Sequence, residues 1–114
     1  MMFETNSPTP TLSATSKINK ITSVLEKYPN TLVQVVGHTD NRGAHAYNQR
    51  LSDKRASNVG NIIYNSGVQN QIFSKGCSYD KPVAPNTNET NMALNRRVEV
   101  YLYANANAVI DTCR

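Results

Sequence analysis

The sequence has no tryptophan, only two cysteines and five glycines, and no long apolar run. A membrane-spanning helix needs about 18 consecutive apolar residues, and no stretch here approaches that length. The first ten residues, MMFETNSPTP, lack the basic and apolar segments of a signal peptide. Acidic residues are scarcer than basic ones, eight against twelve, so the formal net charge is +4. This balance favours anionic partners without selecting one, and it is equally typical of a mildly basic surface.

The two cysteines, Cys77 and Cys113, leave the redox state open. A disulfide between them would close a long loop and stabilise the fold by about 3–4 kcal/mol if the geometry fits. Two free thiols are an equally consistent interpretation. Their spacing is not that of a metal-binding motif.

The chain's 114 residues, 39% of them apolar, indicate one globular domain. Ile18, Ile21 and Leu25 recur at helical spacing and predict a first helix, which Pro29 ends. The β-branched run TLVQVV at residues 31–36 predicts a buried strand directly after it.

A second helix is expected to begin at Ser52, a good N-cap residue, and to end near Gly67. Residues 72–77 suit a short strand, and RRVEVYLY at 96–103 alternates apolar and polar residues as a strand does. With a short strand at 3–6, the order is β-α-β-α-β-β. This order predicts a two-layer α+β sandwich with a mixed sheet and two helices packed on one face.

Asp40 and Arg55 are the strongest candidates for a binding site. Asp40 follows the strand at 31–36, and loops after strand ends are common ligand sites. Arg55 falls in the first turn of the expected helix, where a basic residue is unfavourable unless an anion lies nearby. In one pocket, the carboxylate would hold an ammonium and the guanidinium a carboxylate, the two groups of a free amino-acid centre. A surface Asp40–Arg55 ion pair is the alternative, and composition alone favours it.

Other patterns carry weaker chemistry. His38 and Asp40 supply two possible metal ligands without a third, so we expect neither a metal nor a cofactor. Ser52 is better explained as a cap than as a nucleophile, because G-x-S-x-G is absent. Tyr101 and Tyr103 on the last strand are suited to base stacking, although alternating aromatics more often pack. We therefore do not expect an enzyme, and a nucleic-acid or acidic-polymer binding module stays as an alternative function.

Several motifs in order resemble the OmpA C-terminal-like domain, the peptidoglycan-binding module of OmpA, the Pal lipoprotein and MotB. They are GHTDNRG at 37–43, the N-x-x-L-S-x-x-R-A spacing at 48–56, and NRRVEV at 95–100, with weaker matches at 3–6 and 28–31. The resemblance implies the same β-α-β-α-β-β fold. It also implies a peptidoglycan-binding domain at residues 1–103, followed by a tail at 104–114.

This resemblance implies non-covalent binding of the peptide stem of peptidoglycan through the free amino-acid centre of diaminopimelate. Asp40 would take the ammonium and Arg55 the carboxylate. The other residues implied at the pocket are Thr5, Asn6, Thr39, Asn48, Leu51 and Arg97. The domain would anchor an outer- or inner-membrane protein to the cell wall, through a tether outside these residues and without binding nucleic acid. The implied location is the periplasm, with the outer membrane favoured over the inner, where a disulfide is feasible.

Overall fold

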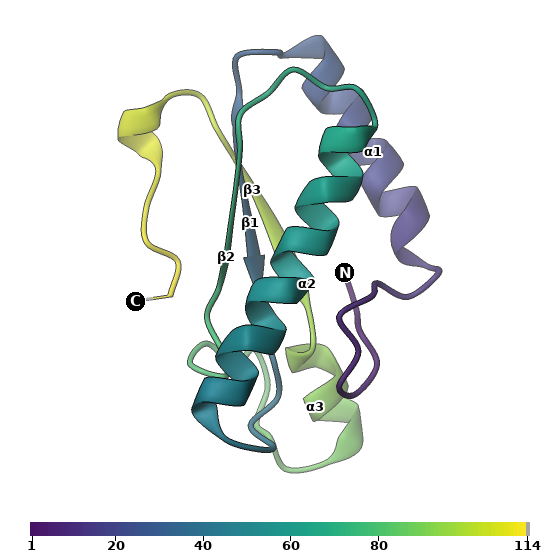
Figure 1. Ribbon diagram of the computed structural model, residues 1–114, viewed down its shortest axis with the longest axis vertical. Helices are drawn as coiled ribbons and strands as arrows, with labels where there is room; N and C mark the ends of the chain where they lie inside the picture. Colours follow the sequence, from purple (N-terminus) through teal and green to yellow (C-terminus); the bar gives the residue numbers. More distant parts are fainter. Residues whose placement is uncertain (114) are drawn as a thin grey trace.

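The computed structural model describes residues 1–113 as a small sheet with two long helices beside it (Figure 1). In chain order the elements are α1 (Ala14–Lys27), β1 (Leu32–Gly37), α2 (His45–Asn65), β2 (Ile72–Gly76), α3 (Glu89–Asn95), β3 (Val98–Tyr103) and the 3-10 turn η1 (Ala106–Ala108). Among the described residues, no helix is long and apolar enough to cross a membrane.

The sheet has the strand order β2-β1-β3, with β1 in the centre. β1 runs parallel to β2 and antiparallel to β3, so that Val35 lies opposite Ser74 on one side and Val100 on the other. Helix α2 connects the two parallel strands and packs on both of them. The expected α+β class and the mixed sheet are therefore confirmed.

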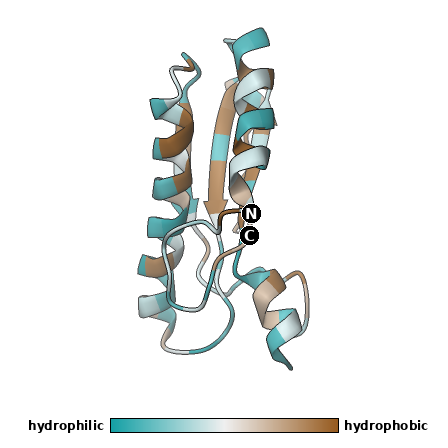
Figure 2. Ribbon diagram, turned by 90° about the vertical axis from the view of Figure 1, so that its right-hand side faces the viewer, coloured by the Kyte–Doolittle hydropathy of each residue, from teal (hydrophilic) through white to brown (hydrophobic). Residues whose placement is uncertain are grey.

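The core lies between the sheet and the two long helices. Leu25 of α1, Val33 and Val35 of β1, and Val59 and Ile63 of α2 are all fully buried in it. Figure 2 colours most of the visible strand as hydrophobic, whereas both long helices mix hydrophobic and hydrophilic residues. This is the pattern of helices that bury a single face.

The first strand expected at residues 3–6 is not present as a strand. Met2 and Phe3 form isolated antiparallel bridges with Arg97 and Pro10, and Asn6 turns the chain with a φ of +58°. The segment is nevertheless fixed, because the Phe3 side chain is buried and its backbone N–H donates to the Arg96 carbonyl.

Helix α2 begins at His45, two turns earlier than expected. Gly43, with a φ of +87°, ends the preceding loop, and the residues between it and Ser52 include no proline or glycine to delay the helix. Ser52 is therefore a fully buried residue within the helix and not its N-cap, and Arg55 does not lie in the first turn. The predicted position of Arg55 in the first turn was wrong, so its place in the helix does not indicate a nearby anion.

A third helix, α3, lies at the end of the segment expected to be a loop. Asn88 caps it by accepting a hydrogen bond from the Asn91 backbone N–H at 2.9 Å. The Asn95 side chain joins the helix to the preceding loop, accepting from the N–H groups of Val83 and Ala84. Seven residues give little periodicity from which to predict a helix.

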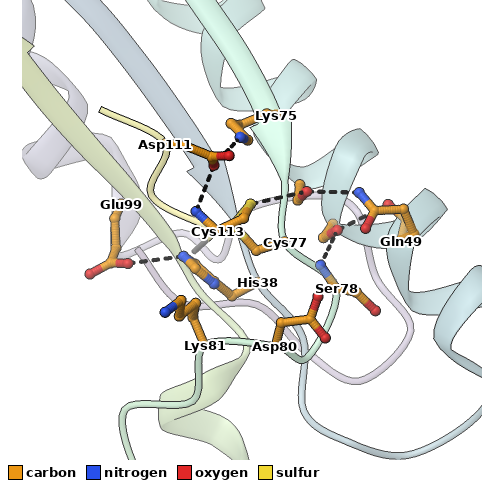
Figure 3. Close-up of a disulfide and its surroundings, with 12 residues drawn as sticks. His38, Gln49, Lys75, Cys77, Ser78, Asp80, Lys81, Glu99, Asp111 and Cys113 are labelled. Atoms are coloured by element: carbon orange, nitrogen blue, oxygen red, sulfur yellow. Dashed lines mark hydrogen bonds and ion pairs between the residues drawn. A yellow bond between two sulfur atoms is a disulfide. The ribbon is translucent and has the colours of Figure 1, made fainter. Parts of the chain in front are cut away.

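The tail after β3 folds back along the sheet and is joined to it covalently. Cys77 and Cys113 form a disulfide, with their Cα atoms 5.1 Å apart (Figure 3). Lys75 Nζ contacts Asp111 Oδ1 at 2.6 Å, and Gln34 Nε2 donates to the Ile110 carbonyl. The structure thus selects the disulfide over two free thiols.

Candidate functional site

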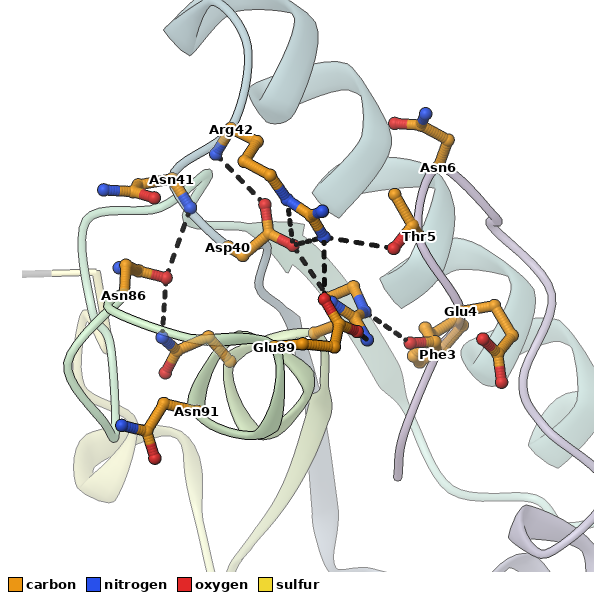
Figure 4. Close-up of polar contacts among 12 residues, drawn as sticks. Phe3, Glu4, Thr5, Asn6, Asp40, Asn41, Arg42, Asn86, Glu89 and Asn91 are labelled. Atoms are coloured by element: carbon orange, nitrogen blue, oxygen red, sulfur yellow. Dashed lines mark hydrogen bonds and ion pairs between the residues drawn. The ribbon is translucent and has the colours of Figure 1, made fainter.

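A polar pocket of about 310 Å³ lies where the N-terminal segment, the loop after β1, the start of α2 and the residue after α3 meet. Its lining residues are Thr5, Asn6, Asp40, Arg42, Gly43, Tyr47, Asn48, Leu51, Arg55 and Arg96. Figure 4 shows the network of polar contacts around Asp40 at its base. Charged groups of both signs therefore face one cavity.

Most of the residues expected from the sequence are brought together here: Asp40, Arg55, Asn48, Leu51, Thr5 and Asn6. Thr39 and Arg97 do not line the pocket. The Thr39 side chain is buried elsewhere, while Arg97 Nη2 donates to the Lys81 carbonyl and to Glu99 Oε1. Successive side chains of extended backbone point to opposite sides, so Arg96 rather than Arg97 reaches Asp40.

The Asp40 carboxylate is nearly buried, with 5% of the residue exposed. Its Oδ1 accepts the Arg42 backbone N–H at 3.0 Å, and its Oδ2 accepts Arg42 Nη2 at 2.7 Å and Arg96 Nη1 at 3.2 Å. Burial alone would raise the pKa of Asp40, but these hydrogen bonds outweigh it and hold the pKa below the usual value. Asp40 is consequently a charged acceptor at neutral pH.

Arg55 is fully buried and is held by backbone carbonyls. Its Nε donates to Ser7, Nη1 to His38 and Nη2 to Glu4, at 2.9, 2.9 and 3.0 Å. Burial lowers the pKa of Arg55 to about 10, against the attraction of Asp40, so the group stays charged at neutral pH. A guanidinium has five N–H groups and these bonds use three of them, so two N–H groups of Arg55 remain for a further acceptor.

Arg96 joins three parts of the site. Its buried guanidinium donates from Nε to the Phe3 carbonyl at 2.9 Å and from Nη2 to Glu89 Oε1 at 2.7 Å, in addition to its bond to Asp40. It therefore ties the N-terminal segment, the β1 loop and α3 to one another. The motif NRR contains two arginines, and only knowledge of which way each points could have selected this one.

Arg42 and Asn48 shape the loop that carries Asp40. The Asn48 side chain is buried and donates to the carbonyls of Arg42 and Ala44, at 2.8 and 3.1 Å. Arg42 extends over Asp40 and donates from Nη2 to Thr5 Oγ1 at 3.0 Å (Figure 4). Sequence reasoning did not select Arg42, Gly43, Tyr47 or Arg96, although Arg42 and Gly43 lie inside the GHTDNRG motif.

Three arginines and Asp40 line the pocket, and Glu89, which is not part of the lining, contacts two of these arginines, Arg42 and Arg96. Such a surplus of positive charge suits a ligand with more carboxylate than ammonium groups. A carboxylate and a guanidinium that line the same cavity can also hold both groups of a single amino-acid centre.

The chain matches the model of the OmpA family over residues 2–96. It is 40% identical over 90 residues to outer membrane porin F of Pseudomonas fluorescens, covering 78% of this chain and 28% of that protein. It is 36% identical over 101 residues to the probable lipoprotein YiaD of Escherichia coli K12, covering 88% of this chain and 46% of that one. The chain thus spans less than half the length of either relative.

The fold is also that of a solved relative. The peptidoglycan-associated lipoprotein from Burkholderia pseudomallei superposes with a TM-score of 0.84 at 27% identity, over 89% of this chain and 86% of that one. The family match covers both the GHTDNRG loop and the N-x-x-L-S-x-x-R-A helix that form the pocket. On this evidence the chain belongs to the OmpA family.

Proposed function

We propose that this domain binds peptidoglycan non-covalently and so anchors an envelope protein to the cell wall. The pocket holds the free amino-acid centre of diaminopimelate in the peptide stem. The family match supports the general function, as does the likeness to a peptidoglycan-associated lipoprotein. The finer assignment rests on the pocket itself.

The observation that carries the assignment is the meeting of Asp40 and Arg55 in one polar cavity. Asp40 accepts the ligand's ammonium, and the remaining N–H groups of Arg55 donate to the adjacent carboxylate. A hydrogen bond to a charged group contributes about 1.5–3 kcal/mol, so one centre gives modest affinity. Repeated stems along the wall polymer raise the overall avidity.

Two conservative substitutions test this assignment. Asp40→Asn keeps the size of the side chain but removes its charge, and Arg55→Lys keeps the charge but loses the forked donor geometry. We expect each to lower binding to purified diaminopimelate-containing sacculi by about tenfold or more in a pull-down titration.

Thermal unfolding of each variant separates lost binding from lost structure, because Arg55 also holds Ser7, His38 and Glu4. Exposed Arg50 of α2 does not line the pocket, so Arg50→Gln serves as the control. Unchanged sacculus binding by a folded Asp40→Asn variant would refute the assignment.

The alternative of nucleic-acid binding depended on basic and aromatic residues along the last strand. Arg96 and Arg97 are both buried and paired with carboxylates, so they do not form an exposed basic stripe. Tyr101 and Tyr103 stack on each other with their ring centroids 6.5 Å apart. Nothing in this arrangement favours the alternative.

The proposed role is binding rather than catalysis. The location we propose is the periplasmic side of the cell envelope, with the outer membrane favoured, because the relatives compared above include an outer membrane porin and lipoproteins. A disulfide is consistent with such an oxidising compartment.

A further inference from the structure

Asp40 already has cationic partners at the position where the proposed ligand's ammonium would bind. Its Oδ2 accepts Arg42 Nη2 at 2.7 Å and Arg96 Nη1 at 3.2 Å, while its Oδ1 accepts the Arg42 backbone N–H. Oδ2 also accepts Arg42 Nε at 3.3 Å, so a ligand ammonium can bind this oxygen only by displacing one of the two guanidinium groups.

The two guanidinium groups differ in how firmly they are held. The Arg96 side chain is 5% exposed and is fixed by the Phe3 carbonyl and Glu89 Oε1. The Arg42 side chain is 45% exposed and lies at the pocket wall (Figure 4). Moving Arg42 away from Asp40 exposes less buried surface than moving Arg96 would. We therefore expect the ligand ammonium to displace Arg42.

Arg42 has a second carboxylate within reach. Glu89 Oε2 lies 3.7 Å from its Nη2, and the Glu89 side chain is 66% exposed. The carboxylate of a bound amino-acid centre would supply a further partner in the same cavity. A simple amine offers no such partner and must displace Arg42 with its ammonium alone.

We propose that Arg42 is a specificity-determining residue whose guanidinium occupies the ammonium site until a ligand with an adjacent carboxylate replaces it. This inference rests on the proposed function of the pocket. The intramolecular Arg42–Asp40 pair competes at a high effective concentration, so it excludes amines while admitting amino-acid centres. The preference for amino-acid centres over amines thus depends on the cost of displacing Arg42 from Asp40 as well as on the contacts that the bound ligand makes.

The test compares two probes with the same carbon chain. Free meso-diaminopimelate has two amino-acid centres, and cadaverine has the two ammonium groups without the carboxylates. Affinities of the intact chain for both are measured by NMR titration at low salt, because screening weakens exposed ion pairs. Arg42→Gln should bind cadaverine roughly fivefold tighter than the unchanged chain, as expected for loss of a competing ion pair of which only the arginine is partly exposed.

The preference for diaminopimelate over cadaverine should fall by at least that factor in Arg42→Gln. Arg42→Lys keeps a competing cation and should retain most of the preference. Arg50→Gln removes the same charge from an exposed site outside the pocket lining and should leave the preference unchanged. In the unchanged chain, diaminopimelate should also shift the Arg42 Nε–H resonance, because Nε lies 3.3 Å from Asp40 Oδ2.

An unchanged preference in Arg42→Gln would overturn the proposal even if sacculus binding is intact. Equal loss of preference in Arg50→Gln would overturn it too, because net charge would then explain the effect. If the unchanged chain binds neither sacculi nor diaminopimelate, both the proposed function and this inference are rejected. A sacculus pull-down run beside the titration distinguishes these results.

Discussion

At the scale of single residues, neighbours in the chain have opposite roles. Arg96 reaches Asp40 in the pocket, whereas Arg97 bonds Glu99 on the other side of the chain. The buried His38 lies on the Arg97 side, with its Nε2 2.9 Å from Glu99 Oε1 (Figure 3). Two residues further on, Asp40 lines the polar pocket.

His38 makes stability depend on pH. Burial and the nearby Arg97 lower the pKa of His38 to about 4, against the opposing effect of Glu99. The unfolded chain therefore binds a proton between about pH 6.5 and pH 4 that the folded chain does not. We expect the free energy of unfolding to fall by up to about 3 kcal/mol as the pH is lowered across this window.

Urea denaturation at pH 4.5 and pH 7 measures this loss. His38→Gln should be less stable at pH 7 but should show a smaller difference between the two pH values. A His38→Gln variant with the full original pH dependence would contradict the assignment.

At the scale of elements, the seam is the close contact of α2, at Ser52, with the strand ends at Gly37 and Gly76. It explains why the two motifs contain Gly37 and Ser52, neither of which lines the pocket. Ser52 is fully buried at this seam, where its hydroxyl accepts the Ser78 backbone N–H at 2.9 Å and donates to the Gln49 carbonyl. A Cβ added to Gly37 would overlap the Ser52 carbonyl group, and one added to Gly76 would overlap the Ser52 side chain. The seam requires small residues on both sides.

Gly37→Ala should therefore destabilise the protein by about 1–3 kcal/mol, or prevent folding, because the overlapping atoms belong to backbone and cannot rotate away. Gly60→Ala in α2 is the matched control. Its Cβ would lie 3.6 Å from Ile72 Cγ2, an ordinary contact, and alanine favours helix by about 0.5–1 kcal/mol over glycine. Chemical denaturation of both variants measures the two changes, and equal effects would refute the packing argument.

At the scale of the whole molecule, residues far apart in the sequence hold the fold and the pocket together. The Met1 ammonium donates to the Val98 carbonyl, and Arg55 binds the carbonyls of Glu4 and Ser7 from the middle of α2. The tail is fixed to the end of β2 by the disulfide. Both ends of the described chain are thereby attached to the central sheet region (Figure 1).

Loss of the disulfide should lower the free energy of unfolding by about 3–4 kcal/mol, from the loop of 36 residues that it closes. Cys113→Ser, compared with the oxidised chain by urea denaturation, measures this cost. Sacculus binding should persist in the folded variant, because no residue of the tail between positions 104 and 113 lines the pocket. Lost binding by a folded variant would show that the tail contributes to the site.

The sequence alone determined the α+β class, the existence of both long helices and the central strand, because periodicity is a local property of the chain. Most of the predicted pocket residues came from the resemblance of its motifs to a known family. The sequence did not reveal that the N-terminal segment forms isolated bridges instead of a strand, that α2 begins at His45, or that α3 exists. Only the tertiary structure showed that Arg96, and not Arg97, contacts Asp40. It also showed the disulfide between Cys77 and Cys113 and the ion pair between Arg42 and Asp40. Each of these depends on where a side chain points and what lies across from it, which neighbours in space determine.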